Sequence, residues 1–362
     1  MNAAKPLKTL VFDWGDTLMI DFPHYSGPMV TWPEVAAVEG ILSALAALHK
    51  TCTILVATNA VESDLAQVRG ALDRAGIGRY VSAIYSPRNL GVSKLELHAF
   101  YRRLEQAAGL DRDETAMIGD NFRYDVLGAH QAGWAAIWYN PSHRPAPGLV
   151  PLHTADVGRM ADLTAAVERL SLPDYETCLA WHQHQGTPRS LLNHVEMVAA
   201  VAYRMALWLR ARGEAADPVL AHRGGLLHDL AKIKEKENPD GRDHGWLAGE
   251  LLESLGQPVL AELARRHVLF GILEPDRAPR TWEEKLVFFA DKLVEGSRVV
   301  TLEERLAALE RRYHPFAPGE LARLQPPLLA LQDELCAAMG FPADELAPRL
   351  TAAVSGQEEL PR

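Results

Sequence analysis

The spacing of apolar residues changes at about residue 171, and this change restricts the folds open to the chain. Before it, short apolar runs of strand length alternate with segments whose apolar residues recur at helical spacing. After about Tyr175 the sequence shows helical spacing and no convincing strand. Alternating strands and helices predict a doubly wound parallel sheet. We therefore expect an α/β domain at residues 1–170, a linker at 171–177 and an all-α domain at 178–362.

Polar residues stand close behind three of the expected strands. In the first half we expect strands at 7–12, 51–57, 81–85, 115–118 and 135–139, and helices at 34–50, 65–75, 94–107, 124–132 and 162–170. Asp13, Thr58 and Asp120 follow the first, second and fourth of these strands. Doubly wound sheets bind ligands beyond the carboxyl ends of their strands. The sequence therefore predicts a site at this edge.

Four segments in this half resemble the motifs of haloacid dehalogenase-like (HAD) hydrolases. Phe-Asp13-Trp-Gly-Asp-Thr17-Leu is similar to the first motif, and Gly119-Asp120-Asn-Phe-Arg-Tyr-Asp125 to the acidic fourth; Thr58 and Lys94 match the second and third. The resemblance implies a Rossmann-like fold and a magnesium-dependent site. It implies that Asp13 is the nucleophile, that Thr58 and Lys94 are catalytic and that Asn59 binds substrate. The implied magnesium ligands are Asp13, the Gly15 backbone carbonyl, Asp120 and Asp125.

The first motif departs from the HAD pattern at Gly15, where the family has a second Asp that acts as general acid and base. An acid follows one place later, at Asp16, but a shift of one residue in extended backbone re-aims the side chain. Loss of general acid–base catalysis can cost about 10²–10⁴ in rate. Only about 40 residues separate Thr17 from Thr58, which leaves room for a minimal cap. Two interpretations stay open, an active phosphatase and a scaffold that binds ligands.

The second half contains an adjacent pair, His228-Asp229, inside the apolar segment Leu226–Lys232. A buried imidazole beside a buried carboxylate is costly unless something neutralises it. A divalent metal would do so, and this donor mixture suits iron, manganese, cobalt or zinc. The expected helices of this half are 191–212, 218 to His228, 244–255, 259–266 and 282–300. The last would place Asp291, Glu295 and Arg298 on one face.

The ordered series of histidines and aspartates resembles the HD superfamily of metal-dependent phosphohydrolases. Ala290-Asp291-Lys-Leu-Val-Glu295-Gly-Ser-Arg298 and His244-Gly245 are similar to segments of its symmetrical diadenosine tetraphosphate hydrolases. The resemblance implies a catalytic role for Asp229 and Lys232. Lys232 and Arg298 could hold phosphate oxygens, although Arg298 could instead pair with Glu295. The implied ligands are His194, His228, Asp229 and Asp291 for one metal, with His244 and His267 added for a second.

Composition limits the partners that the chain can have. A net charge of −10 argues against nucleic acid or a membrane surface as partner. Three widely spaced cysteines fit a reducing cytoplasm. The segment after Val300 is helical and could mediate a homodimer. We expect a cytoplasmic phosphohydrolase that cleaves a phosphoester or phosphoanhydride, most simply of a nucleotide, at a binuclear HD site. The alternatives are a bifunctional enzyme whose HAD site is also active, and a nucleotide-binding regulator.

Overall fold

The computed structural model describes residues 6–147, 154–238, 240–312 and 320–355. The chain divides between Ser171 and Leu172 into two compact units, and each is described by itself. The expected fold class is confirmed, with a parallel sheet in the first unit and mainly helices in the second. Within the described residues, no helix is both long enough and apolar enough to cross a bilayer.

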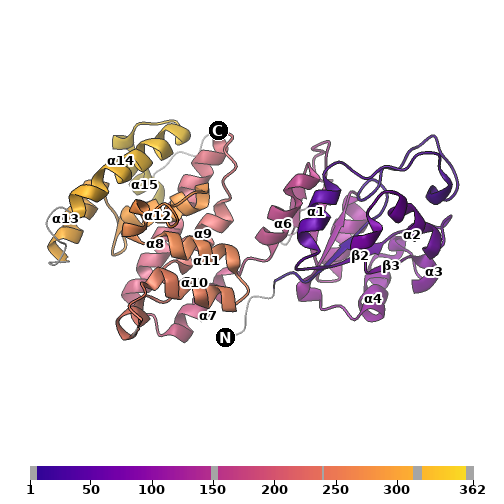
Figure 1. Cartoon of the computed structure of the whole chain (residues 1–362), viewed down its shortest axis with the longest axis horizontal. Helices are drawn as coiled ribbons and strands as arrows, with labels where there is room; N and C mark the ends of the chain where they lie inside the picture. The colour runs from indigo at the N-terminus through magenta and orange to yellow at the C-terminus, as the bar shows by residue number, and fades with distance from the viewer. Residues whose placement is uncertain (1–5, 148–153, 239, 313–319, 356–362) are drawn as a thin grey trace. The chain divides into compact units, whose positions relative to one another are not determined.

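The first unit is built on a parallel sheet, of which Figure 1 labels β2 and β3. Its described strands lie in the order β3-β2-β1-β4-β5-β6. From β1 the chain adds β2 and β3 on one side of that strand, and it then adds β4, β5 and β6 on the other side. The topological switch point therefore lies between β1 and β4. The strands are β1 (Thr9–Phe12), β2 (Thr53–Ala57), β3 (Ala83–Tyr85), β4 (Thr115–Gly119), β5 (Ala135–Tyr139) and β6 (Thr154–Val157). The helices are α1 (Ile41–Leu48), α2 (Leu65–Arg74), α3 (Pro87–Leu90), α4 (Leu97–Ala108), α5 (Gly128–Gln131) and α6 (Leu163–Leu170).

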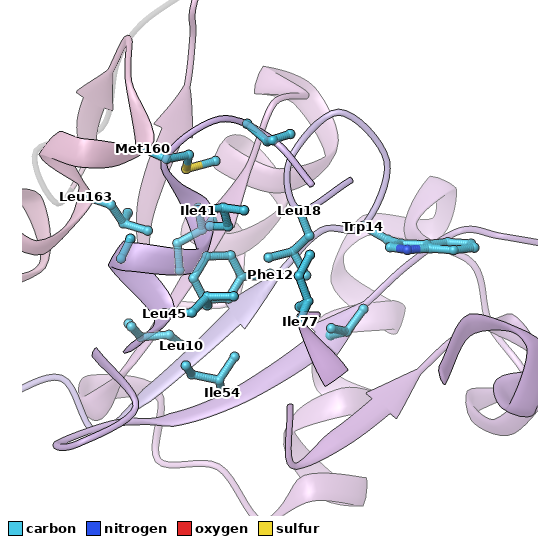
Figure 2. Close-up of a cluster of buried hydrophobic side chains, with 14 of the residues drawn as sticks. Leu10, Phe12, Trp14, Leu18, Ile41, Leu45, Ile54, Ile77, Met160 and Leu163 are labelled. Carbon is cyan, nitrogen blue, oxygen red and sulfur yellow. The ribbon is translucent and has the colours of Figure 1, made fainter. Parts of the chain in front are cut away.

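Both faces of this sheet are buried, because successive strand residues point to opposite sides. Leu10 and Phe12 of β1 belong to the core that includes α1, α2 and α6, whereas Val11 belongs to the core with α4 and α5. Figure 2 shows Leu10 and Phe12 beside Ile41 and Leu45 of α1. This two-sided burial explains why the strands are nearly continuous apolar runs.

The structure corrects three expectations for the first unit. The helix expected at 34–50 begins at Ile41, because the preceding segment pairs with the chain after Thr17; Val38 N donates to Leu18 O at 3.0 Å. The helix expected at 124–132 is a π-helical turn, Phe122–Leu127, followed by α5. A sixth strand, β6, was not expected from the sequence.

The second unit is a helical assembly organised around α8. The α8 residues Val198, Ala202, Met205 and Leu209 recur at helical spacing and are fully buried. Helices α9 and α12 pack against α8. The helices are α7 (Tyr175–Gln185), α8 (Arg189–Ala211), α9 (Pro218–Leu227), α10 (His244–Ser254), α11 (Pro258–Arg266), α12 (Trp282–Lys292), α13 (Leu302–Arg312), α14 (Glu320–Met339) and α15 (Leu346–Val354).

The helix expected at 282–300 was wrong beyond Lys292, where α12 ends. Val294–Glu295 (β7) pairs with Arg298–Val299 (β8) in an antiparallel hairpin, and Gly296 takes a left-handed φ of 61° in the turn. The hairpin also corrects the expectation that this half contains no strand. Asp291, Glu295 and Arg298 therefore do not share a helix face, and the Arg298 side chain is exposed.

Candidate metal centres

Three carboxylates of the first unit converge at the carboxyl ends of β1 and β4. Asp13 follows β1 directly and Asp120 follows β4, and these strands are neighbours. Asp125 comes from the π-helical turn after β4 and is buried. One oxygen from each of the three lies within 4.8 Å of the others, which is a separation that one cation could bridge.

Lys94 lies between two of these carboxylates. Its Nζ donates to Asp13 Oδ1 at 2.5 Å and to Asp125 Oδ1 at 2.9 Å. Burial by itself would lower the pKa of Lys94, but the charges of Asp125 and Asp13 outweigh it and raise that pKa. Asn59 supports the lysine, because its Oδ1 accepts from Lys94 N at 2.7 Å. Thr58 is buried at the end of β2, where its Oγ1 accepts from Ala60 N at 3.1 Å.

The carboxylates of this cluster repel one another, and one lysine does not neutralise them. Burial and the charge of Asp13 raise the pKa of Asp120 to about 6. Burial raises the pKa of Asp125 to about 7, against the opposing charge of Lys94. A divalent cation would relieve this repulsion, and carboxylate oxygens are the ligands that magnesium accepts. The donors at this centre therefore fit a magnesium ion.

The backbone after Asp13 places two acids, Asp16 and Asp21, near the position at which Gly15 replaces the acid of the motif. Gly15 forms a bridge with Met19, and Asp16 has a left-handed φ of 51°. The Asp16 carboxylate is exposed, and its Oδ1 accepts from Asp21 N at 3.0 Å. Partial burial and the charges of Asp16 and Asp13 raise the pKa of Asp21. A second acid thus lies near this centre, and it comes from outside the motif.

The second unit brings together the side chains expected to bind metal there. His194 lies in α8, His228 follows α9, His244 begins α10, and His267 follows α11. Two groups have ligand atoms within 4.8 Å of one another, namely His194, His228 and Asp291, and His228, Asp229 and His267. Asp229 Oδ1 lies 3.2 Å from His244 Nε2 and 3.3 Å from His267 Nε2, whereas its Oδ2 lies 3.6 Å from His228 Nε2.

Each of the four histidines has its Nδ1 held by an oxygen acceptor. Nδ1 of His194 donates to Gly296 O, that of His228 to Gly225 O and that of His267 to Ala264 O, at 3.1, 2.7 and 2.5 Å. Nδ1 of His244 donates to Glu235 Oε1 at 3.0 Å. Such hydrogen bonds fix the tautomer of metal-binding histidines and aim Nε2 at the ion.

The Nε2 atoms face other acceptors at close range. His244 Nε2 and His267 Nε2 are 3.0 Å apart, and His194 Nε2 is 3.0 Å from Asp291 Oδ1. His228 Nε2 is buried and has no hydrogen-bond partner among the described residues. Burial lowers the pKa of His228 to about 3, so this ring is neutral at neutral pH. Acceptors this close need a proton or a cation between them, and neutral His with anionic Asp suits a transition metal.

Three cations surround this centre. Lys232 Nζ donates to His244 Nε2 at 2.9 Å and to Asp229 Oδ1 at 3.3 Å. Buried Lys292 donates to Asp291 Oδ2 and to His267 O. Arg305 of α13 lies 4.0 Å from Asp291, and its side chain is 11% exposed. Lys232 and Arg305 line a cavity of about 480 Å³ at the histidine cluster, and Arg298 does not.

Two glycines allow the helices that carry these ligands to approach closely. A Cβ at Gly225 would lie 2.6 Å from Ala199 Cα, where α9 crosses α8. A Cβ at Gly245 would lie 2.6 Å from Ala264 O, where α10 meets α11. Larger side chains at these positions would separate His228 from His194, or His244 from His267.

Sequence reasoning missed four polar residues at these centres, namely Asp21, Glu235, Lys292 and Arg305. Lys292 had a weak signal, because it follows a predicted ligand directly. Asp21, Glu235 and Arg305 stand in segments without a recognisable motif, and the fold alone brings them close. The substrate-binding role expected for Arg298 came from a resemblance and from a shared helix face; the structure shows no shared face, and Arg298 is exposed in β8 and does not line the cavity.

Comparison with known proteins agrees with this division of the chain. The profile of haloacid dehalogenase-like hydrolases matches residues 15–133, and the profile of the HD domain matches residues 191–295. An uncharacterized protein of Methanocaldococcus jannaschii, MJ0778, is 34% identical over 134 residues, which cover 34% of this chain and 77% of that protein. Pyrimidine 5′-nucleotidase YjjG of Escherichia coli is 37% identical over 116 residues, 32% of this chain and 50% of that enzyme.

Among solved structures, an uncharacterized protein from Listeria monocytogenes aligns with 45% of this chain and 98% of its own length. The sequence identity is 24% and the TM-score is 0.39.

Proposed function

Because the chain joins a haloacid dehalogenase-like hydrolase domain at residues 15–133 to an HD domain at residues 191–295, we propose that it is a metal-dependent phosphohydrolase whose main reaction takes place at the HD centre. The observation that carries this proposal is the set of histidine Nε2 atoms that face one another and the carboxylates of Asp229 and Asp291, while an oxygen acceptor holds the Nδ1 atom of each histidine. We place the join between the domains in the linker at 171–177.

The HD centre has donors for two ions, with Asp229 between them. His194, His228 and Asp291 would hold one, and His244 and His267 the other, each shared with an oxygen of Asp229. Iron, manganese, cobalt and zinc all suit this donor set. When bound, such ions lower the pKa of a water toward about 7 and polarise a phosphoryl oxygen.

The residues of the chain itself supply the phosphate-binding charge. Lys232 and Arg305 are far apart in the sequence but line the same cavity. Lys232 is oriented by the Asp229 carboxylate and Arg305 by the Asp291 carboxylate. A phosphate in the cavity would offer these cations further oxygen acceptors. The cavity volume of about 480 Å³ accommodates a small phosphorylated molecule such as a nucleotide.

A nucleotide is the substrate class that relatives of the first domain favour, and we extend it to the HD centre as part of this proposal. The E. coli relative is named a pyrimidine 5′-nucleotidase, and a second relative, PynA of Streptococcus pneumoniae, has the same activity in its name. Both are partial matches, since the chain spans 50% and 31% of their lengths. The panel of substrates to test therefore contains nucleoside mono-, di- and triphosphates. It also contains diadenosine tetraphosphate, which was expected from the sequence segments alone and which the comparisons with known proteins do not support.

The test combines metal analysis with turnover. Protein purified with and without air is assayed for bound metal, and the metal-free protein is supplied with manganese, iron, cobalt or zinc. We expect Asp229→Ala to lose both metal and turnover. The matched control is His184→Gln, which removes an exposed histidine of α7. Full activity in Asp229→Ala would reject the proposal. Tight nucleotide binding with no hydrolysis under any metal would favour the regulator instead.

A second activity, at the first domain, is favoured by the geometry of Asp13. Its carboxylate stands at the switch point of the sheet, paired with Lys94 and close to Asp120 and Asp125. This is the arrangement that nucleophilic attack on a phosphoryl group requires. Magnesium-dependent turnover that survives Asp229→Ala and disappears in Asp13→Asn would establish it. Turnover unaffected by Asp13→Asn would argue for a scaffold.

A further inference from the structure

The side chain of Asp21 lies in front of the position at which the first motif lacks an acid. A Cβ added to Gly15 would be 3.6 Å from Asp21 Oδ2 and 3.7 Å from Asp21 Cβ, which is ordinary van der Waals contact. A side chain at position 15 would therefore project directly against the carboxyl group of Asp21. No such side chain exists, so the space beside Gly15 is left to that carboxyl group.

The loop between these residues is held so that Asp21 turns back toward Gly15. Asp16 N donates to Met19 O at 2.7 Å, and Ile20 N donates to Ala36 O at 2.9 Å. The Asp16 carboxylate accepts from the backbone of Asp21 at 3.0 Å, so it holds the loop. Left-handed φ at Asp16 is tolerated by Asp better than by most residues. Asp16 is thus a positioning residue, and Asp21 is the acid that it positions.

We propose that Asp21 is the general acid and base of the first domain, in place of the carboxylate that Gly15 cannot supply. This inference rests on the proposed activity of that domain. Asp21 comes from the loop beyond the motif, six positions after Gly15, and its carboxyl group lies beside the space that a side chain at position 15 would enter. Its exposed location suits a group that must exchange protons with water.

The reaction proceeds in two steps. In the first, an Asp13 carboxylate oxygen forms a bond to phosphorus while the bond from phosphorus to the leaving oxygen breaks, and the Asp21 carboxyl gives its proton to that oxygen. In the second, the Asp21 carboxylate takes a proton from a water whose oxygen attacks phosphorus. The bond between phosphorus and Asp13 then breaks, which releases phosphate and restores both side chains to their starting states.

The experiment uses the full chain carrying Asp229→Ala, so that turnover at the HD centre is removed, with magnesium present. Two substrates differ in their need for an acid. The leaving alkoxide of a nucleoside 5′-monophosphate requires a proton, whereas 4-nitrophenolate leaves without one. In this background we compare Asp21→Asn, Asp16→Asn, Gly15→Asp and the pair Gly15→Asp with Asp21→Asn. Glu62→Gln, which removes an exposed carboxylate after β2, is the matched control.

We expect Asp21→Asn to lower nucleotide turnover by about 10² or more. With 4-nitrophenyl phosphate the same variant should release up to one equivalent of nitrophenolate per chain in a burst, then turn over slowly, and phosphate should remain attached to Asp13. A merely structural role for Asp21 would produce no burst. Gly15→Asp should restore turnover to the Asp21→Asn variant, because an acid then projects into the same space. Asp16→Asn keeps the oxygen that accepts from Asp21 N and should cost much less.

Three outcomes would overturn the inference. In the first, Asp13→Asn abolishes turnover but Asp21→Asn leaves it unchanged; the activity of the first domain then stands and the role of Asp21 falls. In the second, Asp16→Asn and not Asp21→Asn produces the burst. In the third, the Asp229→Ala background shows no turnover that depends on Asp13, and the inference then falls together with the second proposed activity while the HD proposal is untouched.

Discussion

At the scale of single residues, both centres are clusters of acceptor atoms that face one another at close range. In the first unit Lys94 neutralises part of the charge of Asp13 and Asp125. In the second, Lys232 and Lys292 donate to the carboxylates of Asp229 and Asp291. In the first unit, the negative charge that Lys94 leaves unpaired is what a bound cation would neutralise. The sequence indicated which histidines and aspartates converge, because these residue types stand in a recognisable order.

The role of a phosphate-binding arginine could not be read in this way. Arg298 was expected there from a resemblance together with helical spacing, but it lies exposed in the hairpin, whereas Arg305 lines the cavity. We predict that Arg305→Ala raises the KM for a nucleotide by roughly 10- to 100-fold, the range for a lost charge-assisted hydrogen bond. Arg298→Ala should leave KM within about twofold, because surface charges contribute little. Equal effects of the two substitutions in steady-state kinetics would contradict this assignment.

The raised pKa of Asp120 predicts how the stability of the first unit depends on pH. Its folded-state pKa of about 6 lies above the unfolded value of about 3.9. The stability that proton binding contributes is therefore complete below about pH 4 and is lost as pH rises through about 6. Magnesium needs the ionised carboxylate, so it should raise the melting temperature more at about pH 7.5 than at about pH 5.

Thermal unfolding with and without magnesium at the two pH values tests this dependence. Asp120→Asn is the control, because its amide is neutral at both. In that variant the melting temperature without metal should be higher than that of the unchanged protein at about pH 7.5. An equal magnesium shift at both pH values in the unchanged protein would show that Asp120 does not control binding.

At the scale of elements, the distance between packed helices positions the metal ligands, and small residues allow that distance to be short. Gly225 allows α9 to touch the backbone of α8 at Ala199. We predict that Gly225→Ala destabilises the second unit by about 1–3 kcal/mol, as overpacking does, and weakens metal binding. Gly271→Ala is the matched control, because its added Cβ would meet Arg277 at an ordinary 3.5 Å. Denaturant unfolding and metal titration measure both effects, and equal behaviour of the two variants would contradict the role of Gly225.

The same scale shows where prediction from sequence succeeded and where it stopped. Helices with a clear stop or cap were placed correctly, as with α9, where Asp217 caps and Pro218 begins the helix. The start of α1 was misplaced because Val35, Val38 and Ile41 recur at helical spacing. In the structure the backbone of residues 36–38 instead hydrogen-bonds to residues 18–20. The end of α12 was misplaced because Gly296 is compatible with a helical pattern, yet here makes a turn. In both cases tertiary pairing overrode local periodicity.

At the scale of the whole molecule, the chain contains two units with separate cores and centres of different donor chemistry. The carboxylates of the first suit magnesium, and the histidines of the second suit a transition metal. Calorimetry of metal-free protein should therefore show two unfolding transitions. A ligand at about 100 times its Kd stabilises the unit that binds it by about 2.7 kcal/mol. Magnesium should shift one transition and manganese mainly the other.

Variants assign each transition to its unit. Asp13→Asn should remove the magnesium shift and keep the manganese shift, and Asp229→Ala should do the reverse. The choice between these ions follows from ligand type, since magnesium binds imidazole poorly whereas manganese accepts both imidazole and carboxylate. Manganese can also enter the carboxylate centre, so the informative result is the magnesium response. If the shift of an unfolding transition by magnesium required Asp229, magnesium would bind at the second centre, contrary to what the donor atoms of the two centres indicate.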